Sequence, residues 1–217
     1  MRRAMIIWGG WGGHDPEECA ALYRRWLHED GFSVRMETDL AAFEDSELGS
    51  LDLIVPIYTM ASISEAQVNG LSEAIKGGTG LAGHHGGMTD AFRESPLYNF
   101  ITGGQYVAHP GNSISYTVDI VKSDDSIVAG LKSFNYVSEQ YYMHVDPAIE
   151  VLATTTFSGE HAPWVEGVVM PVAWKKAYGT GRVFHSTLGH SISEFDVPEM
   201  ATLLRRGVNW AARPEAS

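Results

Sequence analysis

The sequence predicts an α/β protein with a mostly parallel central sheet, helices on both faces of that sheet and a strand-rich second half. Two observations carry this prediction. In the first half, short apolar runs alternate with segments whose apolar residues recur at helical spacing, which is typical of a parallel sheet. In the second half, strand-like segments follow one another without such helices between them.

Composition limits the classes of function. The 217 residues include 15 Lys and Arg against 27 Asp and Glu, a formal net charge of −12, and an acidic chain without a basic run is a poor nucleic-acid binder. No apolar run approaches the roughly 18 residues of a membrane span, so we expect no membrane segment, no signal peptide and a cytoplasmic location. The single cysteine, Cys19, excludes an internal disulfide and a multi-thiolate zinc site.

The first strand is expected over residues 4–8, a continuous apolar run typical of a strand buried on both faces. A helix follows, with Asp15 as its N-cap, Pro16 at its first position and Glu18 completing a capping box. Gly31 ends this helix. Cys19 lies on the apolar side of the helix, so we expect a buried, unreactive thiol.

Further strands are expected at about residues 32–37, 51–56 and 81–82. Between the last two, Ser64 and Gln67 form a capping box that opens a helix, and Gly77 ends it. Another helix is expected at about residues 90–101. This alternation of strands and helices predicts the parallel part of the sheet.

The second half contains five further strand-like segments, at residues 116–121, 134–143, 150–157, 168–177 and 182–188. Asp196 is then expected to cap a final helix with one apolar face, made by Met200, Leu203, Leu204 and Val208. No linker, repeat or charge run divides the chain. We therefore expect one domain over residues 1–217.

Two histidine–glycine turns follow predicted strands, where ligands bind in open parallel sheets. The segment Gly83-His84-His85-Gly86-Gly87 has the glycine frame of a nucleophile elbow, a tight turn that lifts its central residue, here His85, above the sheet. His190 follows Gly189 at the end of the last predicted strand. Such imidazoles suit acid, base or metal-ligand roles, and the alternative is a glycine-rich turn with surface histidines. His185, within the strand, is expected to be structural.

Other polar residues are candidates with a structural alternative. The glycine loop that ends at His14 lacks the G-x-G-x-x-G pattern, so we expect no nucleotide cofactor. Glu139 lies in an aromatic segment, where burial is costly unless the carboxylate is paired or functional; the alternative is an exposed position on an edge strand. His109 and His144 are further candidates. Trp174 would suit sugar stacking, although most tryptophans belong to a core.

These residues, taken in order, resemble the ThuA-like family, which is named for trehalose utilisation, over nearly the whole chain. The resemblance is strongest in the C-terminal half. Its landmarks are Gly83-His84-His85-Gly86, Asp90-Ala91-Phe92-Arg93, Tyr98 through Gly103-Gly104, Tyr106, His109-Pro110, Glu139-Gln140-Tyr141-Tyr142, Met170 to Trp174, and Tyr178 to Phe184 leading to Leu188-Gly189-His190.

The resemblance implies a flavodoxin-like fold of the class I glutamine amidotransferase type that has lost the amidotransferase chemistry. His85 stands where that fold keeps its cysteine, and His190 lies near the place of its catalytic histidine. The family is linked to catabolism of trehalose and related disaccharides through 3-keto sugars, beside a partner oxidoreductase. Many members carry His-Pro where this chain has Asp124-Asp125-Ser126-Ile127, so no site role is expected there.

From this resemblance we expect an enzyme that acts on 3-keto-glycosides by histidine-based acid–base elimination and hydration, or by isomerisation. The expected catalytic residues are His85, His190 and Glu139. The expected substrate-binding residues are His14, Trp11, His84, Asp90, Tyr142, His109 and Trp174. A divalent metal, Zn or Mn, would be held by His14, His85, His144 and His190, although no spacing in the sequence demands it.

Two other functions remain open at this point. The same pocket would serve a non-catalytic carbohydrate-binding or regulatory module. A glutaminase is disfavoured because the elbow lacks a cysteine. A small-molecule sugar is the expected partner, and a homo-oligomer is compatible with the sequence.

Overall fold

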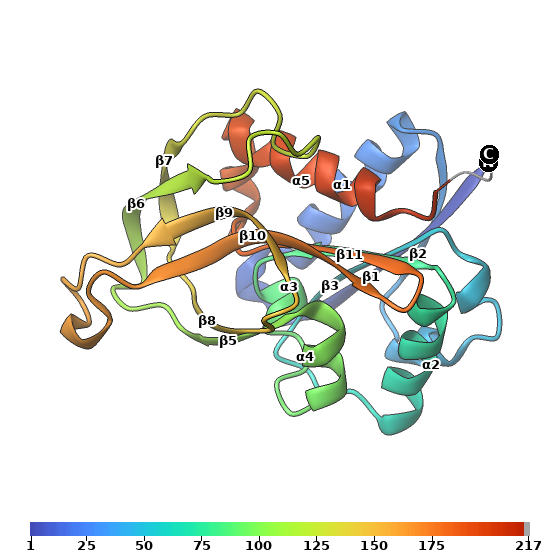
Figure 1. Cartoon of the computed structure of the whole chain (residues 1–217). Helices are drawn as coiled ribbons and strands as arrows, with labels where there is room; N and C mark the ends of the chain where they lie inside the picture. Colours follow the sequence, from blue (N-terminus) through green and yellow to red (C-terminus); the bar gives the residue numbers. More distant parts are fainter. Residues whose placement is uncertain (215–217) are drawn as a thin grey trace.

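The computed structural model describes residues 1–214 of the chain, and Figure 1 shows their arrangement. These residues form a sheet of nine strands in the order β2-β1-β3-β4-β11-β10-β9-β6-β7, and β5 and β8 form a separate two-stranded sheet. The strands are β1 (Arg2–Gly10), β2 (Phe32–Glu37), β3 (Leu53–Thr59), β4 (Gly80–His84), β5 (Gly104–Ala108), β6 (Ser113–Ile120), β7 (Phe134–Glu139), β8 (Tyr142–Val145), β9 (Glu150–Thr156), β10 (Val169–Tyr178) and β11 (Gly181–Ser186). The helices are α1 (Pro16–Glu29), α2 (Glu65–Lys76), α3 (Gly86–Thr89), α4 (Pro96–Thr102) and α5 (Pro198–Ala211).

The sheet is mixed, and only its first half is parallel. Strands β2, β1, β3, β4 and β11 are paired in parallel, whereas β10, β9, β6 and β7 continue the sheet antiparallel. The expected α/β class and strand-rich second half are confirmed, but "mostly parallel" holds only for the five-stranded part. The change occurs because a tight turn at Gly179, with φ of 64°, joins β10 directly to β11, which forces an antiparallel pair.

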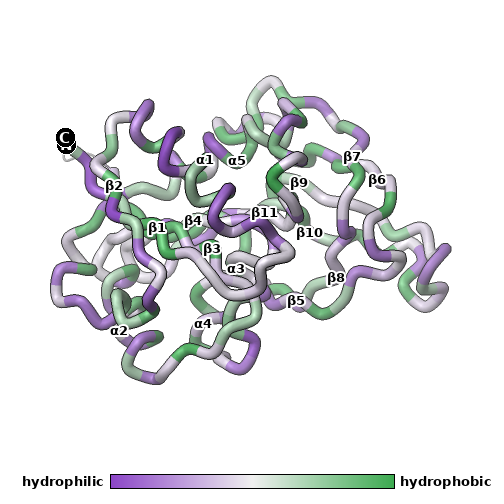
Figure 2. Tube along the Cα trace, turned by 180° about the vertical axis from the view of Figure 1, so that it is seen from behind, coloured by the Kyte–Doolittle hydropathy of each residue, from purple (hydrophilic) through white to green (hydrophobic). Residues whose placement is uncertain are grey.

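Helices cover both faces of the parallel half, as expected (Figure 1). Helices α1 and α5 pack on one face, where Ala4 and Ile6 of β1 point, and α2 and α4 pack on the other, where Met5 and Ile7 point. Alternate residues of a strand face opposite sides, so a strand buried on both faces must be apolar throughout. Figure 2 colours the chain by hydropathy, and the trace of β1 is mostly hydrophobic.

Two predicted elements are broken in the structure. The strand expected over 134–143 divides into β7 and β8, which belong to different sheets, because Gln140 leaves the strand and its amide donates to Thr155 Oγ1 at 2.7 Å. The helix expected over 90–101 is helical only from Pro96 onward, in α4, because residues 90–95 are not helical and the short helix α3 ends before them at Thr89. Strand β5 was not expected; it pairs with β8, and the two strands pack on Trp174 in a third hydrophobic cluster that includes Met143 of β8.

The helix caps agree with the sequence in one case out of three. Ser64 and Gln67 form the expected reciprocal capping box at α2. Asp15 instead takes a left-handed conformation with φ of 47° and makes no side-chain cap; its carboxylate accepts from the backbone N–H of Ile192 at 3.1 Å. Helix α5 likewise begins without a side-chain cap from Asp196. Within residues 1–214, no helix is long and apolar enough to cross a membrane.

His185 gives the fold a pH-dependent stability. Its side chain is fully buried against Trp174, and burial lowers the pKa of His185 well below its usual value. The folded protein therefore keeps this imidazole neutral while the unfolded chain takes up a proton near pH 6.5. The stability contributed by neutral burial is complete above that pH and is lost as the pH falls below it.

We expect His185→Gln to flatten the loss of unfolding free energy between pH 6.5 and pH 5. One such histidine accounts for a slope of about 1.4 kcal/mol per pH unit. Urea denaturation of both proteins at a series of pH values measures it. The exposed His161 provides the control, since His161→Gln should leave the slope unchanged. Equal slopes in the wild type and His185→Gln would contradict the prediction.

Candidate functional site

The carboxyl ends of the parallel strands meet at one edge of the sheet, and polar side chains gather there. His14 follows β1 in a short 3₁₀ turn (Gly12–His14), Thr59 ends β3, His85 follows β4 and His190 follows β11. The strand order of the parallel half, 2-1-3-4 followed by β11, is that of flavodoxin-like sheets, in which ligands bind at this edge.

His85 occupies a strained turn that aims its ring into this cluster. Its backbone has φ of 47° and ψ of −143°, a conformation that costs a side-chain-bearing residue about 1–3 kcal/mol. The turn is fastened to β11, since the His85 backbone N–H donates to Ser186 O and ring Nδ1 donates to Thr187 O, both at 2.7 Å. Ring Nε2 lies 3.1 Å from Glu139 Oε2.

The glycines after His85 are required by space. A Cβ on Gly86 would lie 2.6 Å from Cε1 of His14, and a Cβ on Gly87 would lie 3.0 Å from the Ile57 Cα. Any larger residue would push the turn away from β3 or displace the His14 ring. The predicted elbow geometry is therefore present, with an imidazole in the central position.

His14 is buried beside His85. Its Nδ1 lies 2.9 Å from Thr59 Oγ1, and its ring centroid lies 4.7 Å from that of His85 and 5.0 Å from that of His190. Burial and then the neighbouring imidazoles lower the pKa of His14 to about 2, so it is neutral. Trp11 packs edge-on against the His14 ring and is 47% exposed, so it forms part of the rim of the site.

His190 lies at the opening of the cluster on a loop that is tied at two points. Its backbone N–H donates to Glu194 Oε2 at 3.0 Å. Two residues further on, the backbone N–H of Ile192 donates to the Asp15 carboxylate. Ring Nδ1 lies 3.3 Å from Glu139 Oε2. The Glu139 carboxylate raises the pKa of His190.

Glu139 joins the imidazoles from the antiparallel side of the molecule. It is the last residue of β7, where the chain leaves the sheet, and its side chain is 14% exposed. Oε2 faces His85 and His190, and Oε1 lies 3.5 Å from Nε2 of His109. Burial alone would raise the pKa of Glu139, but His190 and His85 hold it well below its usual range. The centre is thus a carboxylate surrounded by imidazoles.

The structure brings together one set of candidates: ligand atoms of His14, His85, Glu139 and His190 all lie within 4.8 Å of one another. His109 adjoins this set through Glu139. Tyr141, which was not singled out from the sequence, packs on the His85 ring at 4.2 Å between centroids, and Tyr106 packs on Tyr141 at 4.6 Å. Residues 139 and 141 are two apart in an extended segment, so strand alternation favours Tyr141 rather than Tyr142 on the side of Glu139.

Other expected site residues lie elsewhere. His84 points to the opposite face from His85, where Nδ1 bonds to Tyr23 Oη at 3.0 Å, and burial lowers its pKa to about 3. Trp174 is fully buried, and its Nε1 donates to Thr102 O at 3.0 Å. Neither side chain is available to bind a substrate.

Three further candidates are also outside the cluster. His144 is exposed on β8, so the fourth ligand atom of the group comes from Glu139 and not from His144. Tyr142 packs against Phe157. Asp90 is buried and forms an ion pair with Arg93.

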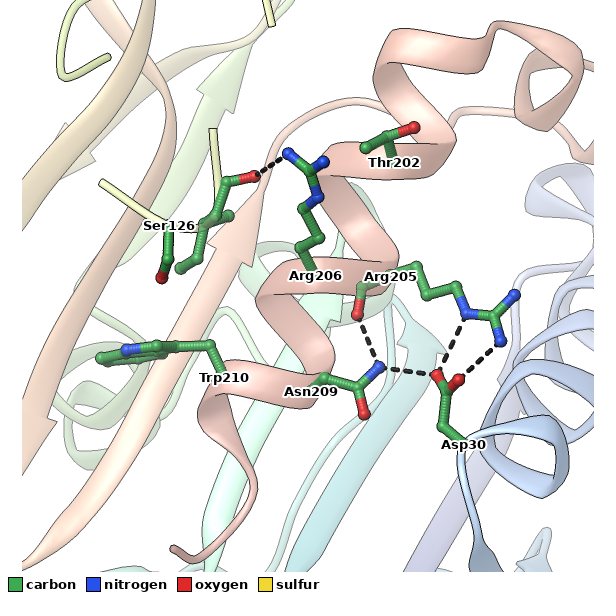
Figure 3. A pocket seen from close by; sticks show the side chains of 8 residues that line it. Asp30, Ser126, Thr202, Arg205, Arg206, Asn209 and Trp210 are labelled. Carbon is green, nitrogen blue, oxygen red and sulfur yellow. Dashed lines mark hydrogen bonds and ion pairs between the residues drawn. The ribbon is translucent and has the colours of Figure 1, made fainter. Parts of the chain in front are cut away.

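A separate pocket of about 550 Å³ lies along the outer side of α5 (Figure 3). It does not adjoin the histidine cluster. Its charged groups satisfy one another, because the Asp30 carboxylate accepts from both Arg205 and Asn209 (Figure 3). The histidine cluster, with several imidazoles around one carboxylate, is therefore the candidate reaction centre.

Comparison with known proteins identifies the family. A family model described as ThuA, trehalose utilisation, matches residues 3–211. A ThuA-like protein from Parabacteroides merdae has a TM-score of 0.80 and 20% identity, covering 100% of this chain and 92% of that chain. A ThuA-like protein from Bacteroides uniformis has a TM-score of 0.79 and 19% identity, covering 97% of this chain and 91% of that chain. A cytoplasmic protein from Salmonella typhimurium has a TM-score of 0.66 and 12% identity, covering 97% of this chain and 100% of that chain. These structures share the fold, and no curated protein matches the chain.

Gly86→Ala should disturb the cluster without unfolding the protein. The added methyl group meets the His14 ring and displaces it, whereas Gly49, which has open space around its Cα, tolerates Ala as a control. Histidine side-chain NMR spectra measure the effect. We expect the His14 resonances to shift in Gly86→Ala and to stay in place in Gly49→Ala; unchanged resonances in both would contradict the described packing.

Proposed function

This chain belongs to the trehalose utilisation (ThuA) family, and we propose that it is an enzyme of disaccharide breakdown whose reaction centre is the cluster of His14, His85, Glu139 and His190. The observation that carries the proposal is that these four groups converge at the carboxyl edge of the sheet. The three histidines follow parallel strands, and Glu139 ends the antiparallel strand β7. Ionisable groups with strongly shifted pKa values cluster at functional sites, and the lowered pKa values of Glu139 and His14 support this proposal.

The proposed substrate is a 3-keto-glycoside such as 3-ketotrehalose. The C3 carbonyl acidifies the hydrogen on C2, so that a base can remove it as a proton and leave an enolate. The enolate then expels the glycosidic oxygen from C1, and an acid protonates that oxygen as it leaves. Water adds to C1 of the resulting enone while a proton returns to C2, so the net reaction is hydrolysis to a 3-keto sugar and an alcohol. The 3-keto group must come from a separate oxidation at C3, which we assign to a partner oxidoreductase.

The site offers two imidazoles for these proton transfers. His109 and His190 are 27% and 26% exposed and flank the two oxygens of Glu139. His85 has both ring nitrogens engaged, with Thr187 O and with Glu139, so its role shifts from proton transfer to orienting the carboxylate. The ionised Glu139 raises the pKa of His190 and so favours its protonated form, which can act as the acid.

The aromatic residues of the rim suit a sugar. Trp11 and Tyr106 lie beside His14 and His109, and aromatic faces pack against the C–H faces of a pyranose. The exposure of Trp11 also favours a second candidate, a carbohydrate-binding module without catalysis. The two differ in outcome, because a binder leaves a 3-keto sugar intact and an enzyme changes its NMR spectrum.

The amidotransferase alternative lacks a nucleophile. His85 occupies the elbow position, and the single cysteine of the chain, Cys19, is buried on α1. Burial raises the pKa of its thiol to about 12, so no thiolate forms near neutral pH.

We expect His190→Gln and Glu139→Gln each to lower the turnover of 3-ketotrehalose by about 10²–10⁴-fold, the usual contribution of a proton-transfer group, because the first removes such a group and the second removes the carboxylate that raises the pKa of His190. NMR of the substrate measures turnover, and circular dichroism with thermal melting checks the fold. His144→Gln is the matched control, since this exposed histidine lies outside the cluster and should retain activity. Full turnover in both site variants would refute the assignment.

A further inference from the structure

We infer that His14, His85, Glu139 and His190 form a binding site for one divalent transition metal ion, with Zn²⁺ as the best match. The site coincides with the proposed reaction centre. The inference rests on the proposed function only for the role of the ion, because binding itself can be measured without any sugar.

The first argument is the direction of hydrogen bonding at His85. A backbone carbonyl can only accept, so the 2.7 Å contact with Thr187 O places a hydrogen on Nδ1. In the neutral ring, Nε2 is then an acceptor, and it lies 3.1 Å from Oε2 of the Glu139 carboxylate, which is also an acceptor. Two acceptors at this distance require a positive group between them.

A second argument is that one proton would not satisfy the whole cluster. A proton shared by His85 and Glu139 would leave Nδ1 of His190 without a partner. This atom is buried and lies 3.3 Å from the same Oε2, but it has no hydrogen bond of normal geometry to the described residues. His14 adds a further lone pair. Its Nδ1 can donate to Thr59 Oγ1 at 2.9 Å, which leaves the lone pair of Nε2 free for an ion. A single metal ion uses all of these lone pairs together.

The spacing and chemistry of the four groups favour zinc. Tetrahedral ligands about 2.0–2.2 Å from Zn²⁺ lie roughly 3.3–3.6 Å from one another. The contacts of Glu139 Oε2 with His85 and His190, at 3.1 and 3.3 Å, are close to this value, and the whole group spans 4.8 Å. Three imidazoles and one carboxylate are borderline ligands that suit zinc.

The surroundings also resemble those of metal sites. Ligand histidines usually donate their second ring N–H to a carbonyl or another oxygen, which fixes the ring, and Thr187 O and Thr59 Oγ1 supply such partners. Among residues 1–214, this is the one group of three or more His, Cys, Asp and Glu side chains with converging ligand atoms. A bound ion would supply positive charge beside the enolate of the proposed reaction. His190 would then be a ligand, and proton transfer would pass to His109.

Metal content and metal titration test the inference. Protein stripped with a chelator is titrated with Zn²⁺ by calorimetry, and with Co²⁺ by visible absorption, which reports tetrahedral coordination. We expect one ion per chain, and at least a 10-fold weaker affinity in His14→Ala and in the nearly isosteric Glu139→Gln, in line with the loss of a ligand. Circular dichroism before titration confirms that each variant is folded.

His144→Ala is the matched control, because it removes one exposed histidine and leaves the cluster intact. Unchanged binding in this variant with loss in the two cluster variants supports the site. No binding to the wild type, or equal loss in His144→Ala, overturns it. One bound Zn²⁺ without turnover of 3-ketotrehalose would reject the proposed function alone, whereas full turnover by metal-free protein would reject the role of the ion and retain the function.

Discussion

The turn at His85 is the constraint on which the rest of the site depends. Its backbone lies in a region that side-chain-bearing residues avoid, and two bonds to the end of β11 hold it there. Gly86 and Gly87 let the turn approach His14 and β3 without collision. Because the same two bonds fix both the backbone and the ring, the direction of the His85 imidazole is set by the sheet itself.

The site also depends on the junction between the two halves of the sheet. The parallel half contributes three imidazoles from the loops after β1, β4 and β11, and burial disfavours positive charge on the first of them, His14. The antiparallel half contributes the carboxylate of Glu139 at the point where β7 ends. The carboxylate depends on the imidazoles, since a buried carboxylate without hydrogen-bond donors or positive charge beside it is costly.

Much of the architecture could be predicted from the sequence because local signals decide it. The strand expected at residues 32–37 coincides with β2, and the capping box at Ser64 and Gln67 is present. The histidine turns were found because glycine spacing is a local property. Long-range contacts decided what was missed: Asp15 caps no helix because Ile192, distant in sequence, uses its carboxylate. Trp174 is buried because β5 and β8 cover it, and β5 itself carries only a weak strand pattern.

The position of β11 has a consequence for how the chain is made. This strand lies between β4 and β10, in the middle of the sheet, yet it is the last strand within residues 1–214. Until residues 181–186 leave the ribosome, β4 and β10 each present an open edge, and such edges favour pairing with other chains. Assembly of the sheet must therefore wait for nearly the whole polypeptide, and a product terminated before residue 181 would lack both its central strand and the fastening of the His85 turn.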